Sequence, residues 1–202
     1  MKRVIFFIYL ILFILNWGKA WSLIEVDITR GNLNPLPLAV SPLSVDQNSK
    51  EKFKDLLKLD DIGAEISKVV ENNLRQSGLF NPLDPKAFLQ KPDIAHVKPR
   101  FEDWALIKAQ ALITGEVKII DEKLRVEFRL WDILAGKEIM ALAFTTVSEN
   151  WRRVGHIITD KVYQRLTGEK GYFDTRIIYV AEEGLKTSRI KKLAIMDQDG
   201  FN

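Results

Sequence analysis

The 202-residue sequence predicts an α+β fold in which a mixed β-sheet has helices packed on one face. Two repeating patterns support this prediction. Apolar residues recur at helical spacing in residues 62–76 and 151–166, whereas residues 111–147 form three consecutive segments of the kind found in strands. Helices on one face of a sheet leave its charged face to water, so we expect an α/β sandwich of two layers.

A change of pattern near Gly168 predicts a boundary between this domain and an all-β segment. Gly168 follows the helix over 151–166, where a left-handed C-terminal cap is expected. Beyond it, residues 176–181 and 190–196 have the composition of two strands, and Gly184 lies in the loop between them. Because an isolated hairpin is marginally stable in water, we expect it to be the first part of a longer β structure.

The first twenty residues predict a secretory signal peptide. Lys2 and Arg3 precede an apolar run over residues 4–15, and Gly18 and Ala20 are the small residues that a signal peptidase requires. A transmembrane anchor is the alternative, but the run is short against the roughly 20 residues that span a bilayer. We therefore expect cleavage, export without insertion into the membrane, and a mature chain that starts at Trp21.

The predicted mature chain has no net charge. Three of the 30 Lys and Arg residues lie in the signal peptide, which leaves 27 to balance the 27 Asp and Glu residues. A nucleic-acid-binding protein needs a clustered basic excess, so no nucleic-acid partner is expected. The sequence has no cysteine, which excludes disulfides and thiolate metal sites.

The first half of the mature chain predicts two strands and one long helix. Residues 24–29 alternate apolar and polar side chains, and residues 36–40 form a second apolar stretch whose neighbouring prolines favour an edge or the start of a strand. Residues 41–61 are polar and charged, which indicates a loop with a short helical turn around Phe53. The helix over 62–76 follows, with acidic residues at its start and Gly78 after its end.

The second half predicts a short strand at 79–84, a proline-rich segment, a short helix over 101–108 and a three-stranded meander. Trp104 is expected to anchor the short helix in the core. Within the strand over 124–130, apolar and charged residues alternate strictly. Trp131 falls on the charged side of that alternation, which predicts a surface contact there.

Candidate catalytic chemistry is sparse. His96 and His156 are the only histidines, and no carboxylates accompany them at metal-ligand spacing in the sequence, so no metal and no cofactor are expected. The sequence contains no nucleophile elbow, phosphate-binding loop or dinucleotide fingerprint. The acidic pairs at 60–61 and 182–183 could be the paired carboxylates of a glycosidase, but the first is better explained as a helix start and the second lies in the all-β segment after Gly168.

Four segments resemble the TolB family, periplasmic proteins of the Tol-Pal system of Gram-negative bacteria. They are residues 28–31 with 35–40, then 74–83, 166–180 and 197–200, and they occur in the family's order over most of the mature chain. The resemblance implies a signal peptide at 1–20, a partner-binding segment at 21–31, an N-terminal α/β domain at 32–170, and a six-bladed β-propeller. Residues 171–202 would then be an incomplete first blade of that propeller.

The resemblance also implies a function without catalysis. A TolB-like protein would link the C-terminal domain of inner-membrane TolA to the outer-membrane lipoprotein Pal, which the propeller binds, and so support outer-membrane integrity and invagination during cell division. Carried over by position, the TolA-binding residues are Trp21, Ser22, Leu23, Ile24, Glu25, Val26, Asp27, Ile28 and Thr29.

The alternating pattern of residues 24–29 suits both this role and a structural one. An extended segment can add a strand to the edge of a partner's sheet, and the same pattern is typical of an ordinary first strand of the domain itself. Two other classes of function stay open as alternatives. An exported small-ligand-binding or hydrolytic α/β domain would need a deep pocket with convergent polar groups. A nucleic-acid-binding module is disfavoured by the absence of net charge.

Overall fold

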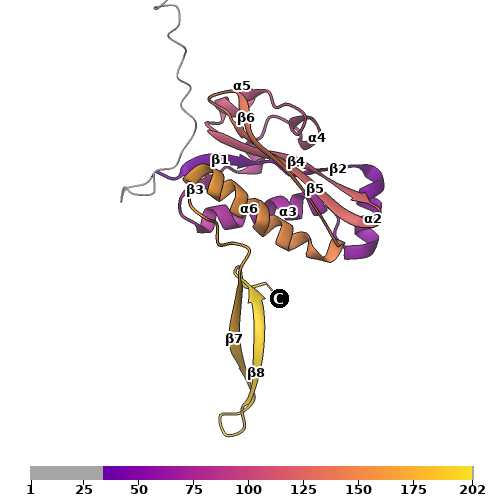
Figure 1. Ribbon diagram of the computed structural model, residues 1–202, viewed down its shortest axis with the longest axis vertical. Coiled ribbons are helices and arrows are strands. Elements are labelled where there is room, and N and C mark those ends of the chain that lie inside the picture. The colour runs from indigo at the N-terminus through magenta and orange to yellow at the C-terminus, as the bar shows by residue number, and fades with distance from the viewer. Residues whose placement is uncertain (1–33, 202) are drawn as a thin grey trace, which may run out of the picture.

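A computed structural model describes residues 34–201, which form a mixed sheet with helices and a separate hairpin (Figure 1). The predicted signal peptide and the segment Trp21 to Thr29 lie outside the described residues. The α+β fold predicted from the sequence is confirmed. No helix within residues 34–201 has both the length and the apolar character needed to cross a bilayer.

The main sheet combines parallel and antiparallel strands in the order β3-β1-β4-β5-β6, with β2 paired to β4. Strand β1 is parallel to both β3 and β4, whereas β4, β5 and β6 form the predicted antiparallel meander. The strands are β1 (Leu36–Val40), β2 (Ser44–Val45), β3 (Phe80–Pro82), β4 (Ala111–Ile120), β5 (Lys123–Asp132) and β6 (Lys137–Thr146).

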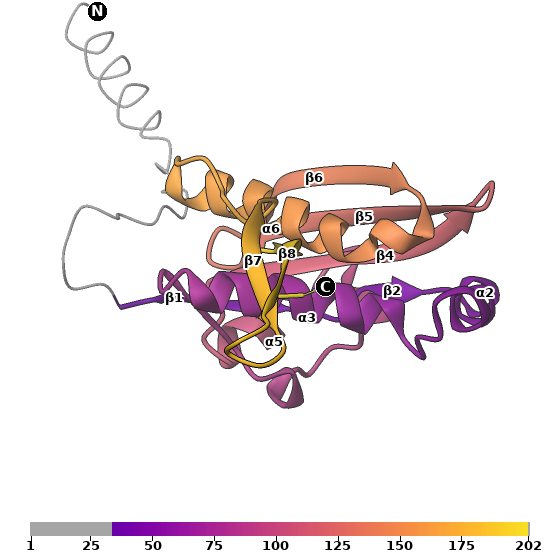
Figure 2. The same ribbon diagram turned by 90° about the horizontal axis from the view of Figure 1, so that it is seen from below.

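Helices α3 (Ile62–Gln76) and α6 (Trp151–Thr167) lie side by side on one face of this sheet (Figures 1 and 2). Asp61 caps α3 by accepting a hydrogen bond from the backbone N–H of Ala64. Gly168 ends α6 in the left-handed conformation, as its sequence position predicts. The apolar faces of both helices and the inward residues of β1, β4 and β5 form the main core, which includes Leu38, Ile66, Leu74, Phe128, Ile158 and Leu166.

The opposite face of the sheet is partly covered, which the two-layer prediction did not include. The short helix α5 (Phe101–Leu106), with Leu83 and Phe88 of the segment before it, packs a second core there. That segment also contains the 3-10 turn η1 (Pro85–Ala87) and the short helix α4 (Pro92–Ala95). Trp104 is buried in that core, as predicted. The second core consists of Ala39, Trp104, Ala109, Leu112, Trp131 and Ile133.

The prediction that Trp131 makes a surface contact is wrong, because its side chain is only 6% exposed. The register between β5 and β6 shifts at Leu130 and Trp131, and the last three residues of β5 are all buried. The indole Nε1 donates a hydrogen bond of 2.8 Å to Thr114 Oγ1. Residues 128–130 keep the strict alternation of buried and partly exposed side chains. At the end of β5, however, α5 covers the face of the strand that is otherwise open to water.

Residues 47–57, predicted to be a loop with a helical turn, form an 11-residue helix, α2 (Gln47–Leu57). Asp46 caps it by accepting a hydrogen bond of 3.0 Å from the backbone N–H of Ser49. Phe53 is buried and attaches the helix to the main core. Most of its remaining residues are exposed, which explains why the segment resembles a loop in composition.

The C-terminal hairpin is a separate two-stranded sheet that projects from the domain (Figure 1). It follows α6 through residues 168–175 and consists of the two predicted strands, β7 (Arg176–Glu183) and β8 (Ile190–Asp197). Apolar side chains on both of its faces are exposed, among them Ile178 and Val180 on one face and Ile177 and Tyr179 on the other. Among the described residues, the hairpin therefore meets the domain only at its base.

Candidate functional site

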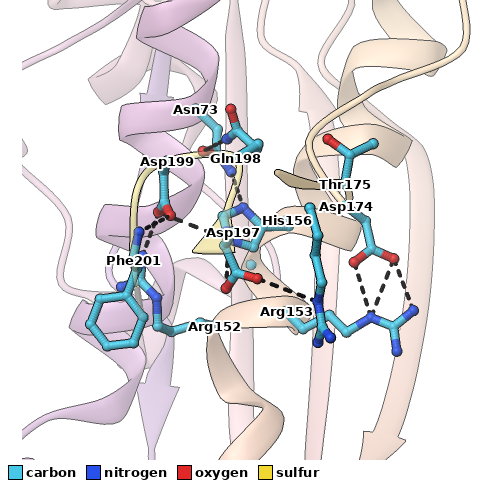
Figure 3. Close-up of polar contacts among 12 residues, drawn as sticks. Asn73, Arg152, Arg153, His156, Asp174, Thr175, Asp197, Gln198, Asp199 and Phe201 are labelled. Atoms are coloured by element: carbon cyan, nitrogen blue, oxygen red, sulfur yellow. Dashed lines mark hydrogen bonds and ion pairs between the residues drawn. The ribbon is translucent and has the colours of Figure 1, made fainter. Parts of the chain in front are cut away.

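Polar side chains from three elements meet at the base of the hairpin (Figure 3). Helix α6 contributes Arg152 and His156, which lie four residues apart on one helix face. Helix α3 contributes a buried asparagine, and the end of β8 with the turn after it contributes three consecutive polar residues. We call this set the junction cluster: Asn73, Arg152, His156, Asp197, Gln198 and Asp199.

The turn after β8 brings the carboxylates back toward α6. Gly200 has a φ of 82°, and its N–H donates to the carbonyl of Asp197. The N–H of Gln198 donates to the carbonyl of Thr175, just before β7. Both ends of the hairpin are therefore held together where they reach the domain.

His156 is the most buried member of the cluster apart from Asn73, with 2% of its surface exposed. Its Nδ1 lies 2.8 Å from Asn73 Nδ2, and Asn73 Oδ1 accepts a hydrogen bond of 2.8 Å from Gln198 Nε2. Its Nε2 has no hydrogen-bond partner and lies 3.9 Å from Asp197 Oδ2 and 3.8 Å from Asp199 Oδ2.

Burial sets the protonation of this histidine. It lowers the pKa of His156 below its ordinary value, because the charged imidazolium loses its hydration. The carboxylates of Asp199 and Asp197 oppose this effect, and Arg152 adds to it. The imidazole is therefore neutral at neutral pH, with one ring nitrogen available as an acceptor or a ligand.

Two arginines of α6 attach the hairpin to the helix. Arg152 forms an ion pair with Asp199, and its guanidinium carbon lies 3.8 Å from the centre of the Phe201 ring. Arg153 pairs with Asp174 through two nitrogens, with Nε to Oδ1 at 3.0 Å and Nη2 to Oδ2 at 3.1 Å. This pairing raises the pKa of Arg153 further above its already high value.

A third contact orders the connection between α6 and β7. Asp160 of α6 accepts hydrogen bonds from the backbone N–H groups of Phe173 at 2.7 Å and Asp174 at 3.2 Å. Gly171 lies so close to Asp160 that a Cβ there would stand 2.3 Å from Asp160 Oδ1. The chain can therefore pass Asp160 only because residue 171 has no side chain.

The cluster offers donors for a metal ion as well as for structural hydrogen bonds. One imidazole nitrogen and two carboxylate oxygens lie within 4.8 Å of one another, a donor set that suits borderline divalent cations. No local pattern in the sequence predicts this set, because Asp197 and Asp199 follow His156 by about forty residues. The one local signal is the i, i+4 spacing of Arg152 and His156 on a helix.

The other residues considered in the sequence lie elsewhere. His96 follows α4, where its Nε2 is 3.6 Å from Glu116 Oε2. Asp61 caps α3, and Glu182 pairs with Arg189 and Lys191 on the hairpin. The paired carboxylates at 60–61 and 182–183 thus have structural roles in the described part of the chain.

A surface hollow of about 530 Å³ lies away from the junction cluster, between α2 and the segment after β6. Its lining is mixed, with charged residues of α2 and the apolar Leu56, Ile119 and Val147 around a wide opening. The small-ligand and hydrolytic alternatives require a deep pocket with convergent polar groups, and this hollow does not have that form.

Comparison with known proteins gives one consistent result. The family model for the TolB amino-terminal domain matches residues 24–139. The Tol-Pal system protein TolB of Pelagibacter ubique (strain HTCC1062) is 80% identical over 192 residues, which are 95% of this chain and 43% of that protein. The crystal structure of TolB from Acinetobacter baumannii superposes with a TM-score of 0.66 and 21% identity, covering 88% of this chain and 40% of that one. The chain thus spans less than half the length of these relatives.

Proposed function

The chain belongs to the TolB amino-terminal domain family, and on that premise we propose that it is a coupling protein of the Tol-Pal system. In this proposal it works in the periplasm, has no catalytic role, and links TolA of the inner membrane to Pal of the outer membrane. The observation that carries the proposal is the match of the family model over more than half of the chain.

We assign the TolA contact to the segment Trp21 to Thr29. Its alternation of apolar and polar residues suits an extended strand that pairs with the edge of a partner's sheet. The segment precedes β1, the first strand of the main sheet, so a bound partner would be connected directly to the domain. The described part of the domain has a core of its own, formed by α3, α6 and the strands of the main sheet.

We assign the rest of the chain to two supporting roles. The domain over 32–170 is a rigid carrier built on the packing of α3 and α6 against the sheet. The hairpin over 171–202 is the start of a further β unit, because both of its faces expose apolar side chains that a neighbouring strand or sheet would bury. Contact with Pal would be made by that further unit.

A deletion tests the proposed TolA contact. The chain without residues 21–27 should lose binding to the TolA C-terminal domain in a calorimetric titration and keep its far-ultraviolet circular dichroism. Replacement of Ile24 or Val26 by Asp should weaken binding by about 1 to 3 kcal/mol, the cost of removing one buried apolar side chain. A matched change on the polar side of the strand, Glu25→Gln, should leave the affinity nearly unchanged.

Two results would contradict this assignment. Full affinity for TolA after the deletion would exclude the segment as the binding element. Loss of folding after the deletion would show instead that residues 21–27 are chiefly a strand of the domain's own sheet.

A further inference from the structure

His156, Asp197 and Asp199 are the only group of at least three metal-ligating side chains found to converge within residues 34–201. Their donor atoms all lie within 4.8 Å of one another. We propose that the junction cluster is a binding site for a divalent cation of the Zn²⁺ class, with His156 Nε2, Asp197 Oδ2 and Asp199 Oδ2 as the protein ligands. The cation would connect helix α6 to the end of the hairpin.

The unpartnered nitrogen of His156 is the first argument for this site. Its Nε2 is buried, makes no hydrogen bond and faces the two carboxylates. Buried polar atoms in folded proteins nearly always have a partner, so a nitrogen in this position calls for one. A cation between the three donors would provide it.

The separations between the donors are the second argument. Zn²⁺ binds imidazole nitrogen and carboxylate oxygen at about 2.0 to 2.2 Å, so tetrahedral ligands stand roughly 3.4 Å apart. The distances from His156 Nε2 to the two carboxylate oxygens are 3.8 and 3.9 Å. Each aspartate must move toward His156 by roughly half an ångström, and the two carboxylate oxygens, which lie within 4.8 Å of each other, must also come closer. Both aspartates belong to the end of a strand and the turn after it.

The surroundings of His156 suit a metal ligand. Histidine ligands usually donate their other ring N–H to an oxygen that holds the ring in place. Nδ1 of His156 faces the side-chain amide of Asn73, which in turn is bonded to the amide of Gln198. Rotating both amides by half a turn preserves the bond between them and presents Asn73 Oδ1 to the Nδ1–H of His156. The rotation gives up the hydrogen bond of 3.2 Å that Asn73 Nδ2 donates to Thr159 Oγ1, and the bond to the metal-bound imidazole replaces it.

Charge in the cluster determines which cation can bind. Arg152 already contacts Asp199 Oδ2, and Arg176 Nε lies 3.7 Å from Asp197 Oδ1. A carboxylate oxygen has two lone pairs, so Oδ2 of Asp199 can accept from Arg152 and bind a cation at once. The two arginines nevertheless repel a cation, and the site therefore depends on the imidazole nitrogen ligand of His156. Zn²⁺ fits this requirement, whereas Mg²⁺ and Ca²⁺ prefer oxygen ligands alone.

The test is a calorimetric titration of the purified full chain with ZnCl2 after treatment with EDTA, together with thermal unfolding with and without Zn²⁺. We expect one Zn²⁺ per chain and a higher unfolding temperature in its presence. His156→Gln and Asp199→Asn should each weaken binding about tenfold or more. Arg152→Met, which removes the competing charge, should bind Zn²⁺ more tightly, and an excess of Mg²⁺ should not displace it.

Matched variants separate this site from adventitious binding. His96→Gln removes the other histidine and Asp174→Asn removes a nearby carboxylate that pairs with Arg153, and both should bind Zn²⁺ as the unchanged chain does. Absence of saturable binding, or unchanged binding by Asp199→Asn, would overturn the proposal. Loss of binding in His96→Gln would also overturn it. Asp199 lies in the turn after β8, outside the cores of the domain, so Asp199→Asn should fold normally. This variant therefore tests the proposed site even where His156→Gln fails to fold.

Discussion

Gly155 of α6 lies directly against Val69 of α3, so closely that a Cβ at residue 155 would stand 2.8 Å from Val69 Cγ1. The two helices pack on one face of the sheet, and this contact sets how near they approach. A glycine in the middle of a helix lowers its intrinsic stability, so its presence here is explained by packing rather than by helix formation.

We expect Gly155→Ala to destabilise the domain by about 1 to 3 kcal/mol, because the added methyl group overpacks the helix interface. Urea denaturation followed by circular dichroism measures this change. The double variant with Val69→Ala should be less destabilised than the sum of the two single variants, since the smaller side chain makes room. Alanine at the exposed Lys161 of the same helix should have almost no effect, and equal losses at both positions would refute the packing argument.

Trp131 provides a second prediction. Trp131→Phe removes the donor for Thr114 Oγ1, which is buried, and should lower the free energy of unfolding by about 1 to 3 kcal/mol. Adding Thr114→Val removes the unpaired hydroxyl as well and should recover part of the loss. A single change on an exposed surface would cost no more than about 0.5 kcal/mol, so a loss that small would favour the surface position predicted from the sequence.

These two positions show what the sequence alone could and could not predict. The long helices and the meander can be predicted from the spacing of their apolar residues, because burial of one face of a helix or strand requires apolar residues at regular intervals. The surface position predicted for Trp131 is wrong because the alternation along β5 separates buried from exposed side chains only where one face of the strand is open to water. At the end of β5 that face is covered by α5. Helix α2 was missed because one buried aromatic residue, Phe53, holds a helix whose composition is otherwise that of a loop.

The junction cluster could not be predicted for a different reason. It depends on a contact between α6 and a turn about forty residues later, and no local pattern reports the angle at which the hairpin leaves the domain. The sequence does predict the helix that contains His156, and Asp197 and Asp199 directly follow the second predicted strand. Their meeting is a property of the connection over residues 168–175, where Asp160 and Gly171 fix the path.

The cap of α2 gives a prediction about acid. The hydroxyl and the backbone N–H of Ser49 hold the pKa of Asp46 below its ordinary value of 3.8. Because the folded state favours the ionised carboxylate, this contribution is present above the ordinary value and is lost as the pH falls through the lower, folded value. Asp46→Ala should cost about 0.5 to 2 kcal/mol at pH 7, typical of a helix cap.

Measurements of unfolding at pH 7 and near pH 3 test this sign. The difference in stability between the unchanged chain and Asp46→Ala should shrink at the lower pH, where the unchanged chain begins to lose its ionised cap. Asp46→Asn, which keeps a capping oxygen without the charge, should retain most of the stability at both values. A difference that grows toward acid would contradict the assigned role.

The connection between α6 and the hairpin supplies the last prediction, which amide hydrogen exchange can check. The backbone N–H groups of Phe173 and Asp174 donate to the carboxylate of Asp160, so they should exchange slowly. The strands β7 and β8 have no neighbours in the described structure beyond each other, and their amides should exchange faster than those of α6. Asp160→Ala removes both acceptor oxygens. Since a hydrogen bond to a charged group contributes about 1.5 to 3 kcal/mol, exchange at residues 173 and 174 should accelerate about tenfold or more.

Exchange within α3 should stay unchanged in the same variant, which controls for global loss of stability. Slow exchange throughout both strands in a monomer would show that the hairpin packs against the domain along its length, contrary to the structure described above.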